Sequence, residues 1–173
     1  MPAKILCNGV PKSGTHALAK AVQLLGQQTT LAHAPYENKP EGKSIHIVRN
    51  PRDTIVSWMR FTRTESAQGF LIGAFDNFYE LPLYEQFAGY APYKDDKDVL
   101  TVRFEDLIST PKTLEDIAEY LEVPMLSDAF DRLPGLTVTW TGKLSNWADH
   151  WTNEVETAWV KARGPEVEAM WNY

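Results

Sequence analysis

The stretch Gly9-Val10-Pro11-Lys12-Ser13-Gly14-Thr15-His16 lies near the start of the chain, between a short apolar run and an amphipathic one. Residues 4–8 before it indicate a buried strand, and apolar residues recur at a helical spacing from Ala17 to Leu25 after it. A turn of small residues between a strand and a helix collects backbone N–H groups at the positive end of the helix, which is a geometry that binds phosphate or sulfate. Lys12 adds a point charge that can follow a departing anion. The stretch therefore predicts an anion-binding loop.

Two further strands are expected later in the chain. Residues 44–49 are almost continuously apolar, as in a parallel strand that is covered on both faces, and residues 99–104 form a similar run. A helix is predicted after the first of these strands, from Arg52 to Arg63, with Asn50 as its N-cap and Pro51 in its first turn. Another helix is predicted from residues 109–111 to residue 121. Strands that alternate with helices indicate a three-layer α/β/α fold with a central, mostly parallel sheet.

The segments between these elements are less regular. Residues 27–33 suggest a short extended segment that ends at His33, because Pro35 disfavours helix at Ala34. Residues 69–78 have a helical spacing, and residues 81–93 mix prolines, a glycine and tyrosines and are expected to be partly loop. Ligands bind at the carboxyl ends of parallel strands. The anion-binding loop, His33, Arg49 and Phe104 all fall at such ends.

Composition limits the class of protein. The 173 residues, 43% of them hydrophobic, suit one domain spanning residues 1–173. A net charge of −6 argues against a nucleic-acid partner or an anionic membrane surface. No apolar run reaches the ~18 residues of a membrane span, so the expectation is a soluble, cytoplasmic protein. Cys7 is the single cysteine and is expected to be a buried apolar residue.

The loop does not fit the ATP- and GTP-binding pattern. That pattern, G-x-x-x-x-G-K-[ST], needs a lysine after the second glycine and a hydroxyl on Mg²⁺. Here Thr15 and His16 occupy those positions, and Lys12 comes two residues before Gly14. The second strand ends in Arg49 rather than in an aspartate that could hold a metal. Magnesium-dependent NTPase or kinase chemistry is therefore poorly supported.

A different phosphate loop accounts for more of the sequence. Residues 11–15 resemble the 5′-phosphosulfate loop of the sulfotransferases that use 3′-phosphoadenylyl sulfate (PAPS), and residues 49–57 resemble the 3′-phosphate motif of that family. Residues 102–107 with Pro111 are similar to its later strand and turn, and residues 142–147, 151–152 and 171–173 are similar to its closing loop and last helix. The resemblance implies a P-loop NTPase-like sulfotransferase fold. It also implies transfer of a sulfuryl group from PAPS, without a metal, to a hydroxyl or amine of a small-molecule or glycan acceptor, leaving PAP.

The resemblance also assigns roles to residues. Lys12 would stabilise charge on the oxygen between phosphate and sulfate, and His33 in the sequence His33-Ala34-Pro35 would take the acceptor proton. PAPS needs two anion sites, because its 3′-phosphate is separate from its 5′-phosphosulfate. Arg49 would grip the 3′-phosphate, with Ser57 about two helical turns further on. The complete set of expected donor-binding residues is Pro11, Lys12, Ser13, Gly14, Thr15, His16, Arg49, Ser57, Phe104, Gly142 and Lys143.

Three features depart from the family pattern. Ala17 stands where an aromatic residue often stacks on adenine, so that Phe104 or a tryptophan of the tail would have to replace it. Trp140 and Thr141 stand where a basic pair usually precedes the glycine of the closing loop, and Lys143 would have to supply the charge. The chain is also short, which implies a shallow and open acceptor site. So compact an enzyme would suit a bacterium or a virus that infects one.

Other hypotheses remain open at this point. A nucleotide kinase-like protein would need a metal carboxylate from Asp53 or Asp106. A PAP-binding accessory protein without catalysis would keep the anion sites alone. Arg49 would have a purely structural role if it paired with Asp53 or Glu105, and Glu37 is an alternative to His33 as the base.

Overall fold

The computed structural model describes residues 4–62, 67–134 and 144–173. Its centre is a parallel sheet in the order β2-β1-β3-β4. The strands are β1 (Ile5–Asn8), β2 (Thr29–Ala32), β3 (Ser44–Val48) and β4 (Val99–Arg103). All four lie where the sequence predicts extended segments, with ends that differ by one or two residues. The predicted α/β fold with a parallel sheet is confirmed.

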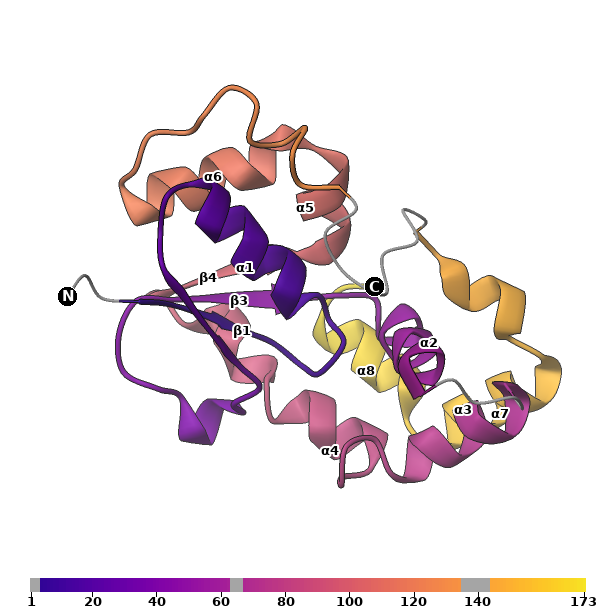
Figure 1. Cartoon of the computed structure of the whole chain (residues 1–173). Coiled ribbons are helices and arrows are strands. Elements are labelled where there is room, and N and C mark those ends of the chain that lie inside the picture. The colour runs from indigo at the N-terminus through magenta and orange to yellow at the C-terminus, as the bar shows by residue number, and fades with distance from the viewer. Residues whose placement is uncertain (1–3, 63–66, 135–143) are drawn as a thin grey trace.

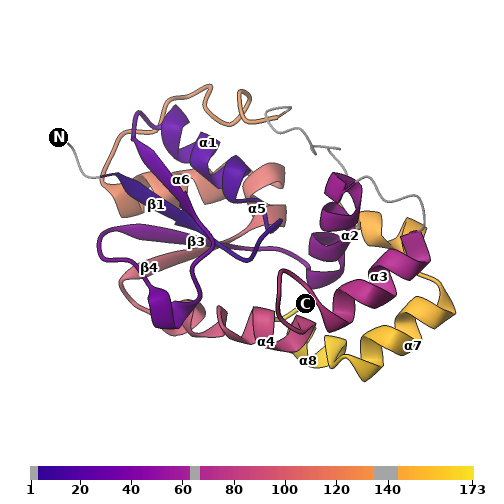
Figure 2. The same ribbon diagram turned by 60° about the horizontal axis from the view of Figure 1, so that its bottom comes forward.

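Helices cover both faces of this sheet (Figure 1). On one face lie α1 (Thr15–Leu24), α5 (Phe104–Ser109) and α6 (Pro111–Leu121), and on the other lie α4 (Leu83–Ala88) and α8 (Gly164–Met170). Beyond the carboxyl ends of the strands lie α2 (Pro51–Thr62), α3 (Ala67–Asp76) and α7 (Asn153–Lys161) (Figures 1 and 2). Short 3₁₀ turns are η1 (Tyr36–Asn38), η2 (Ala91–Asp95) and η3 (Asn146–His150).

Two hydrophobic cores hold the layers together, one on each side of the sheet. The first joins α1 and α6 to the strands, and Leu18, Ile45 and Ile117 within it are fully buried. The second is rich in aromatic rings and joins α2, α3, α4, α7 and α8, with Trp159 at its centre. Every residue of β3 is buried, which explains why residues 44–48 are nearly continuously apolar.

The structure differs from the expected elements around Phe104. This residue was expected to end the fourth strand, but it begins the six-residue helix α5. Thr110 then separates α5 from α6, with an extended backbone at φ −138° and ψ 143°. The residue before a proline is disfavoured in the helical region, so Pro111 imposes this break. Residues 81–93, expected to be partly loop, contain α4 and the start of η2.

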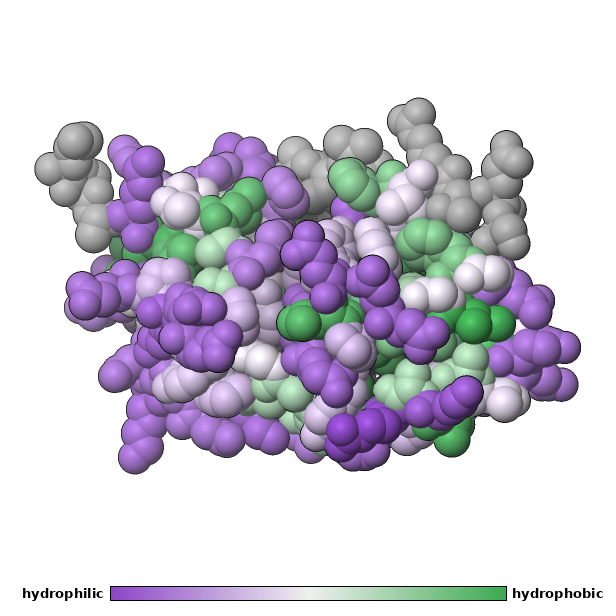
Figure 3. Space-filling view, turned by 90° about the horizontal axis from the view of Figure 1, so that it is seen from below, coloured by the Kyte–Doolittle hydropathy of each residue, from purple (hydrophilic) through white to green (hydrophobic). Residues whose placement is uncertain are grey.

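Large exposed hydrophobic residues are scattered over the surface. They are Leu31, Phe61, Leu81, Leu126, Leu144 and Val160. Seen from below, the molecule is mostly hydrophilic, and hydrophobic residues form separate groups (Figure 3). This face therefore offers no single large apolar surface. Within residues 4–62, 67–134 and 144–173, none of the helices is long and apolar enough to cross a membrane.

One buried histidine lies in the middle of a strand rather than at a strand end. His46 in β3 is fully buried, and neither of its ring nitrogens has a hydrogen-bond partner among the described residues. Its ring stacks on Tyr93, with 4.5 Å between the centroids, and on Trp171 at 5.7 Å. Burial lowers the pKa of His46 to about 3, because an imidazolium there would lose its hydration without gaining a partner.

This histidine should make the stability of the fold depend on pH. An unfolded imidazole binds a proton below about pH 6.5, whereas folded His46 stays neutral down to about pH 3. The unfolded state therefore gains protons first, and stability falls as the pH falls through this window. From pH 7.5 to pH 5 we expect a loss of about 2 kcal/mol in the free energy of unfolding, measured by urea denaturation. The variant His46→Phe should keep the aromatic stack and lose most of this dependence, and an equally steep dependence in that variant would contradict the assignment.

Candidate active site

The loop between β1 and α1 has the backbone of an anion site. The N–H of Ser13 donates to the Val10 carbonyl at 3.0 Å, and Lys12 and Gly14 both have positive φ, at 71° and 111°. The N–H of Leu18 makes the first helical bond, to the Gly14 carbonyl, so the three N–H groups before it have no partner within the helix. A Cβ atom at Gly14 would lie 2.4 Å from Cδ2 of Phe104. Only glycine satisfies both the backbone and the close packing at this position.

Ser13 places a hydroxyl inside this loop. The residue is 1% exposed, and its Oγ has no hydrogen-bond partner among the described residues. A Cβ at Gly9 would lie 2.5 Å from that oxygen and 2.6 Å from the Ile47 carbonyl, so the loop packs closely on β3. A buried hydroxyl without a partner costs free energy, which a bound acceptor oxygen would recover.

Arg49 leaves the end of β3 beside this loop. Its Nη1 donates to the Lys12 carbonyl at 3.5 Å, and its guanidinium lies 4.5 Å from the centroid of the Phe104 ring. The Nε atom is buried and has no partner within the described part of the chain. Burial lowers the pKa of Arg49, although the charges of Asp53 and Glu105 act in the opposite direction.

The two carboxylates considered as structural partners of Arg49 are engaged elsewhere. Asp53 accepts the backbone N–H groups of Ser145 and Trp147, each at 3.0 Å. Glu105 accepts the N–H of Asn50 at 2.9 Å and the hydroxyl of Tyr173 at 2.6 Å. Among the described residues neither carboxylate forms an ion pair with Arg49. Within the described part of the chain the Arg49 guanidinium therefore has no direct ion pair, although the charges of both carboxylates act on it.

Lys12 is held in place only weakly. Its ammonium lies 3.3 Å from the centroid of the Phe61 ring, and Phe61 itself is 59% exposed. Partial burial lowers the pKa of Lys12. A cation–π contact at an exposed site is worth only about 0.5–1 kcal/mol, so an anion in the loop can draw the ammonium away.

His33 follows the end of β2, and its geometry fixes the tautomer of its ring. Its Nδ1 lies 2.8 Å from the carbonyl oxygen of Gly9. A carbonyl only accepts, so Nδ1 carries the proton and Nε2 keeps a free lone pair. Ala34, the residue after His33, is held by the side chain of Asn8. Asn8 Nδ2 donates to the Ala34 carbonyl and Asn8 Oδ1 accepts the Ala34 N–H, both at 2.9 Å. His33 is exposed and thus has its basic nitrogen available at the carboxyl edge of the sheet.

The remaining expected site residues occupy different environments. Thr15 begins α1 and is buried, as is Pro11, whereas His16 in the first turn is exposed. Ser57 lies on α2 and is 8% exposed. Phe104 is also 8% exposed and packs on Gly14 and Arg49, a placement that favours supporting these two residues over stacking on adenine. Gly142 and Lys143 lie outside the described residues, as does Trp140.

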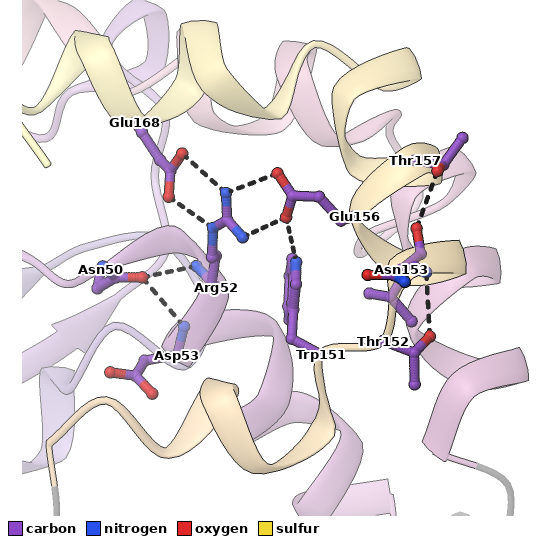
Figure 4. A network of polar contacts seen from close by, with 10 residues as sticks. Asn50, Arg52, Asp53, Trp151, Thr152, Asn153, Glu156, Thr157 and Glu168 are labelled. Atoms are coloured by element: carbon purple, nitrogen blue, oxygen red, sulfur yellow. Dashed lines mark hydrogen bonds and ion pairs between the residues drawn. The ribbon is translucent and has the colours of Figure 1, made fainter.

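The predicted N-cap of α2 is present, and Arg52, the basic residue that follows it, has a structural role. Asn50 Oδ1 accepts the N–H groups of Arg52 at 2.9 Å and of Asp53 at 3.3 Å. The Arg52 guanidinium lies between the carboxylates of Glu156 and Glu168, with shortest N–O distances of 2.5 and 2.7 Å (Figure 4). Arg52 thus joins the start of α2 to α7 and α8 and is not available to a ligand.

Comparison with known proteins identifies the family. The sequence profile of the sulfotransferase domain matches residues 29–138, which is more than half of the chain. The chain belongs to the sulfotransferase domain family. The matched region includes Arg49, Ser57 and Phe104, and it begins after the loop that contains Lys12. No curated protein matches the sequence significantly.

Similarity to solved structures covers nearly the whole of this chain. The mouse sulfotransferase SULT7A1, solved in complex with PAP, superimposes with a TM-score of 0.78 and 19% identity over 98% of this chain and 87% of that one. Retinol dehydratase, solved with androsterone and the inactive cofactor PAP, gives a TM-score of 0.75 and 15% identity over 97% and 82% of the two chains. At these identities the similarity shows the fold.

Sequence reasoning did not identify one contact near the candidate site of this sulfotransferase domain. Arg60 Nη2 lies 3.3 Å from Nε2 of His150, which joins the last turn of α2 to η3. The helical spacing of three residues between Ser57 and Arg60 was the available signal, since it places both on one face. Among the described residues, no group of three or more histidine, cysteine, aspartate or glutamate side chains could hold a metal ion.

Proposed function

We propose that this sulfotransferase domain transfers a sulfuryl group from PAPS to a hydroxyl or amine of an acceptor, leaving PAP. One observation carries the proposal: Ser13 Oγ, in the loop after β1, and Arg49 Nε, directly after the adjacent strand β3, are buried donors without partners among the described residues. Each such donor costs about 1–3 kcal/mol unless an acceptor reaches it. PAPS has two separate phosphates and can satisfy two such places at once. That both structural relatives were solved with PAP supports this choice.

The loop residues would bind the 5′ end of the donor. The N–H groups of Gly14 and Thr15 and the hydroxyls of Ser13 and Thr15 would donate to the 5′-phosphate at the start of α1, with Pro11 and His16 bordering the same site. Lys12 would leave the Phe61 ring and place its ammonium near the oxygen that joins phosphate to sulfate. The 3′-phosphate would lie between Arg49 and Ser57. Gly142 and Lys143 complete the proposed donor-binding residues.

The bound donor supplies the sulfuryl group as an electrophile. His33 would accept the proton of the acceptor hydroxyl or amine at Nε2, while its Nδ1–H stays bonded to the Gly9 carbonyl. The acceptor atom then forms a bond to sulfur as the bond from sulfur to the bridging oxygen breaks. Lys12 would stabilise the negative charge that this oxygen keeps in PAP. The acceptor is proposed to be a small molecule or a glycan.

The kinase-like alternative lacks support at Asp53, one of its two candidate metal carboxylates. Both carboxylate oxygens of Asp53 already accept backbone N–H groups, from Ser145 and Trp147. Asp53 is also buried, so its carboxylate serves to hold this segment and is not open to a hydrated divalent cation.

Ligand-dependent stability tests the proposal. We expect PAP, at 100 times its dissociation constant, to raise the free energy of unfolding by about 2.7 kcal/mol, measured by thermal unfolding. ATP with Mg²⁺ at the same concentration should stabilise the protein much less, because it has no 3′-phosphate for Arg49. Equal stabilisation by the two ligands, or greater stabilisation by ATP with Mg²⁺, would reject a PAPS site.

A further inference from the structure

Arg60 is a cation in the last turn of α2, and the donor site as described so far assigns it no role. Of the other arginines, Arg52, Arg132 and Arg163 each form an ion pair with a carboxylate, and Arg103 donates to two backbone carbonyls. Among the described residues Arg60 has no carboxylate partner, and its guanidinium contacts a nitrogen of His150 instead.

The position of Arg60 relates it to the proposed 3′-phosphate site. It lies three residues after Ser57, so the two side chains leave the same face of α2. Burial is the main cause that lowers the pKa of Arg49, and the charge of the Arg60 guanidinium acts in the same direction. Arg49 itself has no ion pair among the described residues and has a buried Nε without a partner. Within the described residues neither guanidinium is paired directly with a carboxylate, so a dianion between them would supply both with a partner.

His150 sets the direction of the Arg60 side chain. The guanidinium can only donate, so Nε2 of His150 must be the unprotonated ring nitrogen. Burial and the Arg60 charge lower the pKa of His150, whereas Asp149 acts in the opposite direction. The imidazole is therefore neutral near pH 7 and accepts the bond without neutralising the arginine. A carboxylate at position 150 would also hold Arg60, but it would neutralise the positive charge that attracts a phosphate.

We propose that Arg60 binds the 3′-phosphate of the donor nucleotide together with Arg49, and that His150 is a positioning residue for Arg60. This proposal rests on the proposed function, because it assigns a further residue to the same donor site. A phosphate monoester has a charge near −2, which two guanidinium groups can match with several charge-assisted hydrogen bonds. Ser57 would contribute a hydroxyl between them.

Two nucleotides that differ at the 3′ position test the role of Arg60. The dissociation constants of PAP and of adenosine 5′-monophosphate, which differs from PAP only in lacking the 3′-phosphate, are measured by calorimetry on the full chain. Arg60→Gln should weaken PAP binding about 10- to 100-fold and leave the binding of adenosine 5′-monophosphate nearly unchanged. The matched control Arg132→Gln removes an exposed arginine outside the site and should change neither value.

The outcomes separate this proposal from the proposed function. If Arg60→Gln leaves PAP affinity unchanged, or weakens both ligands equally, Arg60 does not bind the 3′-phosphate. The second result would indicate a structural role, such as a cation at the end of a helix. If the wild-type protein shows no preference for PAP over adenosine 5′-monophosphate, the donor assignment itself is wrong, and the proposal for Arg60 falls with it.

Two substitutions at position 150 test the positioning role. His150→Gln keeps an acceptor close to the place of Nε2 and should retain the preference for PAP over adenosine 5′-monophosphate. His150→Leu removes the acceptor and should reduce that preference several-fold. An unchanged preference in His150→Leu would show that Arg60 needs no positioning by this residue. A reduction that glutamine does not rescue would likewise contradict the role of an acceptor.

Discussion

Replacing Lys12 with alanine should lower the turnover number for sulfuryl transfer about 100- to 1,000-fold, the effect of removing one group that stabilises charge in the transition state. Alanine keeps the same backbone strain, because the positive φ of 71° at this position is unfavourable for lysine and alanine alike. The fold should therefore stay intact, and the loss should appear in the rate rather than in stability. The measurement is transfer of radiolabelled sulfate from PAPS in a screen of hydroxylated small molecules and glycans.

A matched control variant and the alternative hypothesis of a non-catalytic protein give this experiment clear outcomes. Lys20→Ala removes a lysine of α1 that lies outside the loop and should leave turnover unchanged. If the protein is instead a PAP-binding accessory without catalysis, Lys12→Ala will change only the affinity for PAP, and no acceptor in the screen will be sulfated by the wild-type protein. A Lys12→Ala variant that keeps full turnover would refute the role assigned to this lysine.

The second large effect concerns stability rather than catalysis. Replacing Arg52 with alanine should lower the free energy of unfolding by about 3 kcal/mol, because it leaves Glu168 facing a partly buried space without its partner. The side chains of Arg52 and Glu168 are only 12% and 19% exposed, whereas Glu156 is 44% exposed and contributes less. The Arg52 guanidinium also lies 4.7 Å from the ring of Trp147 and 4.9 Å from that of Trp151.

Urea denaturation of three variants at low salt would check this expectation, because urea does not screen ion pairs. Arg163→Ala breaks an exposed pair with Glu166 and should cost less than about 1 kcal/mol. Adding Glu168→Gln to Arg52→Ala should recover part of the lost stability, because it removes the unpaired charge. Equal costs for Arg52→Ala and Arg163→Ala would mean that burial around Arg52 does not strengthen its ion pairs.

Local sequence patterns predicted most of the fold and the first parts of the site. Apolar runs in the sequence predict β1, β3 and β4. The turn at residues 9–16 indicates Lys12 as a site residue, and the motif that follows β3 indicates Arg49. These features are readable because each depends on a few neighbouring residues. The short helix α5 was not predicted, since six residues carry too little periodicity to separate a helix from a strand end.

Contacts between distant parts of the chain could not be predicted. Asp53 meets Ser145 and Trp147 more than 90 residues later, and Arg60 meets His150 across 90 residues. Each of these side chains is an ordinary polar residue in its own segment. Neighbouring residues do not indicate that the Asp53 carboxylate holds the tail, or that Arg60 contacts a histidine rather than a carboxylate among the described residues, until the fold brings the segments together.

The strand order also sets a direction for the chemistry. In the sheet, β1 with its lysine loop stands between β2, which leads to His33, and β3, which leads to Arg49. Under the proposed function, the nucleotide would extend from the loop toward the β3 side, and the acceptor would approach from the β2 side, so that transfer runs across the sheet edge. Since no described strand continues the sheet beyond β2, bulky acceptors would meet no strand on their side of the reaction.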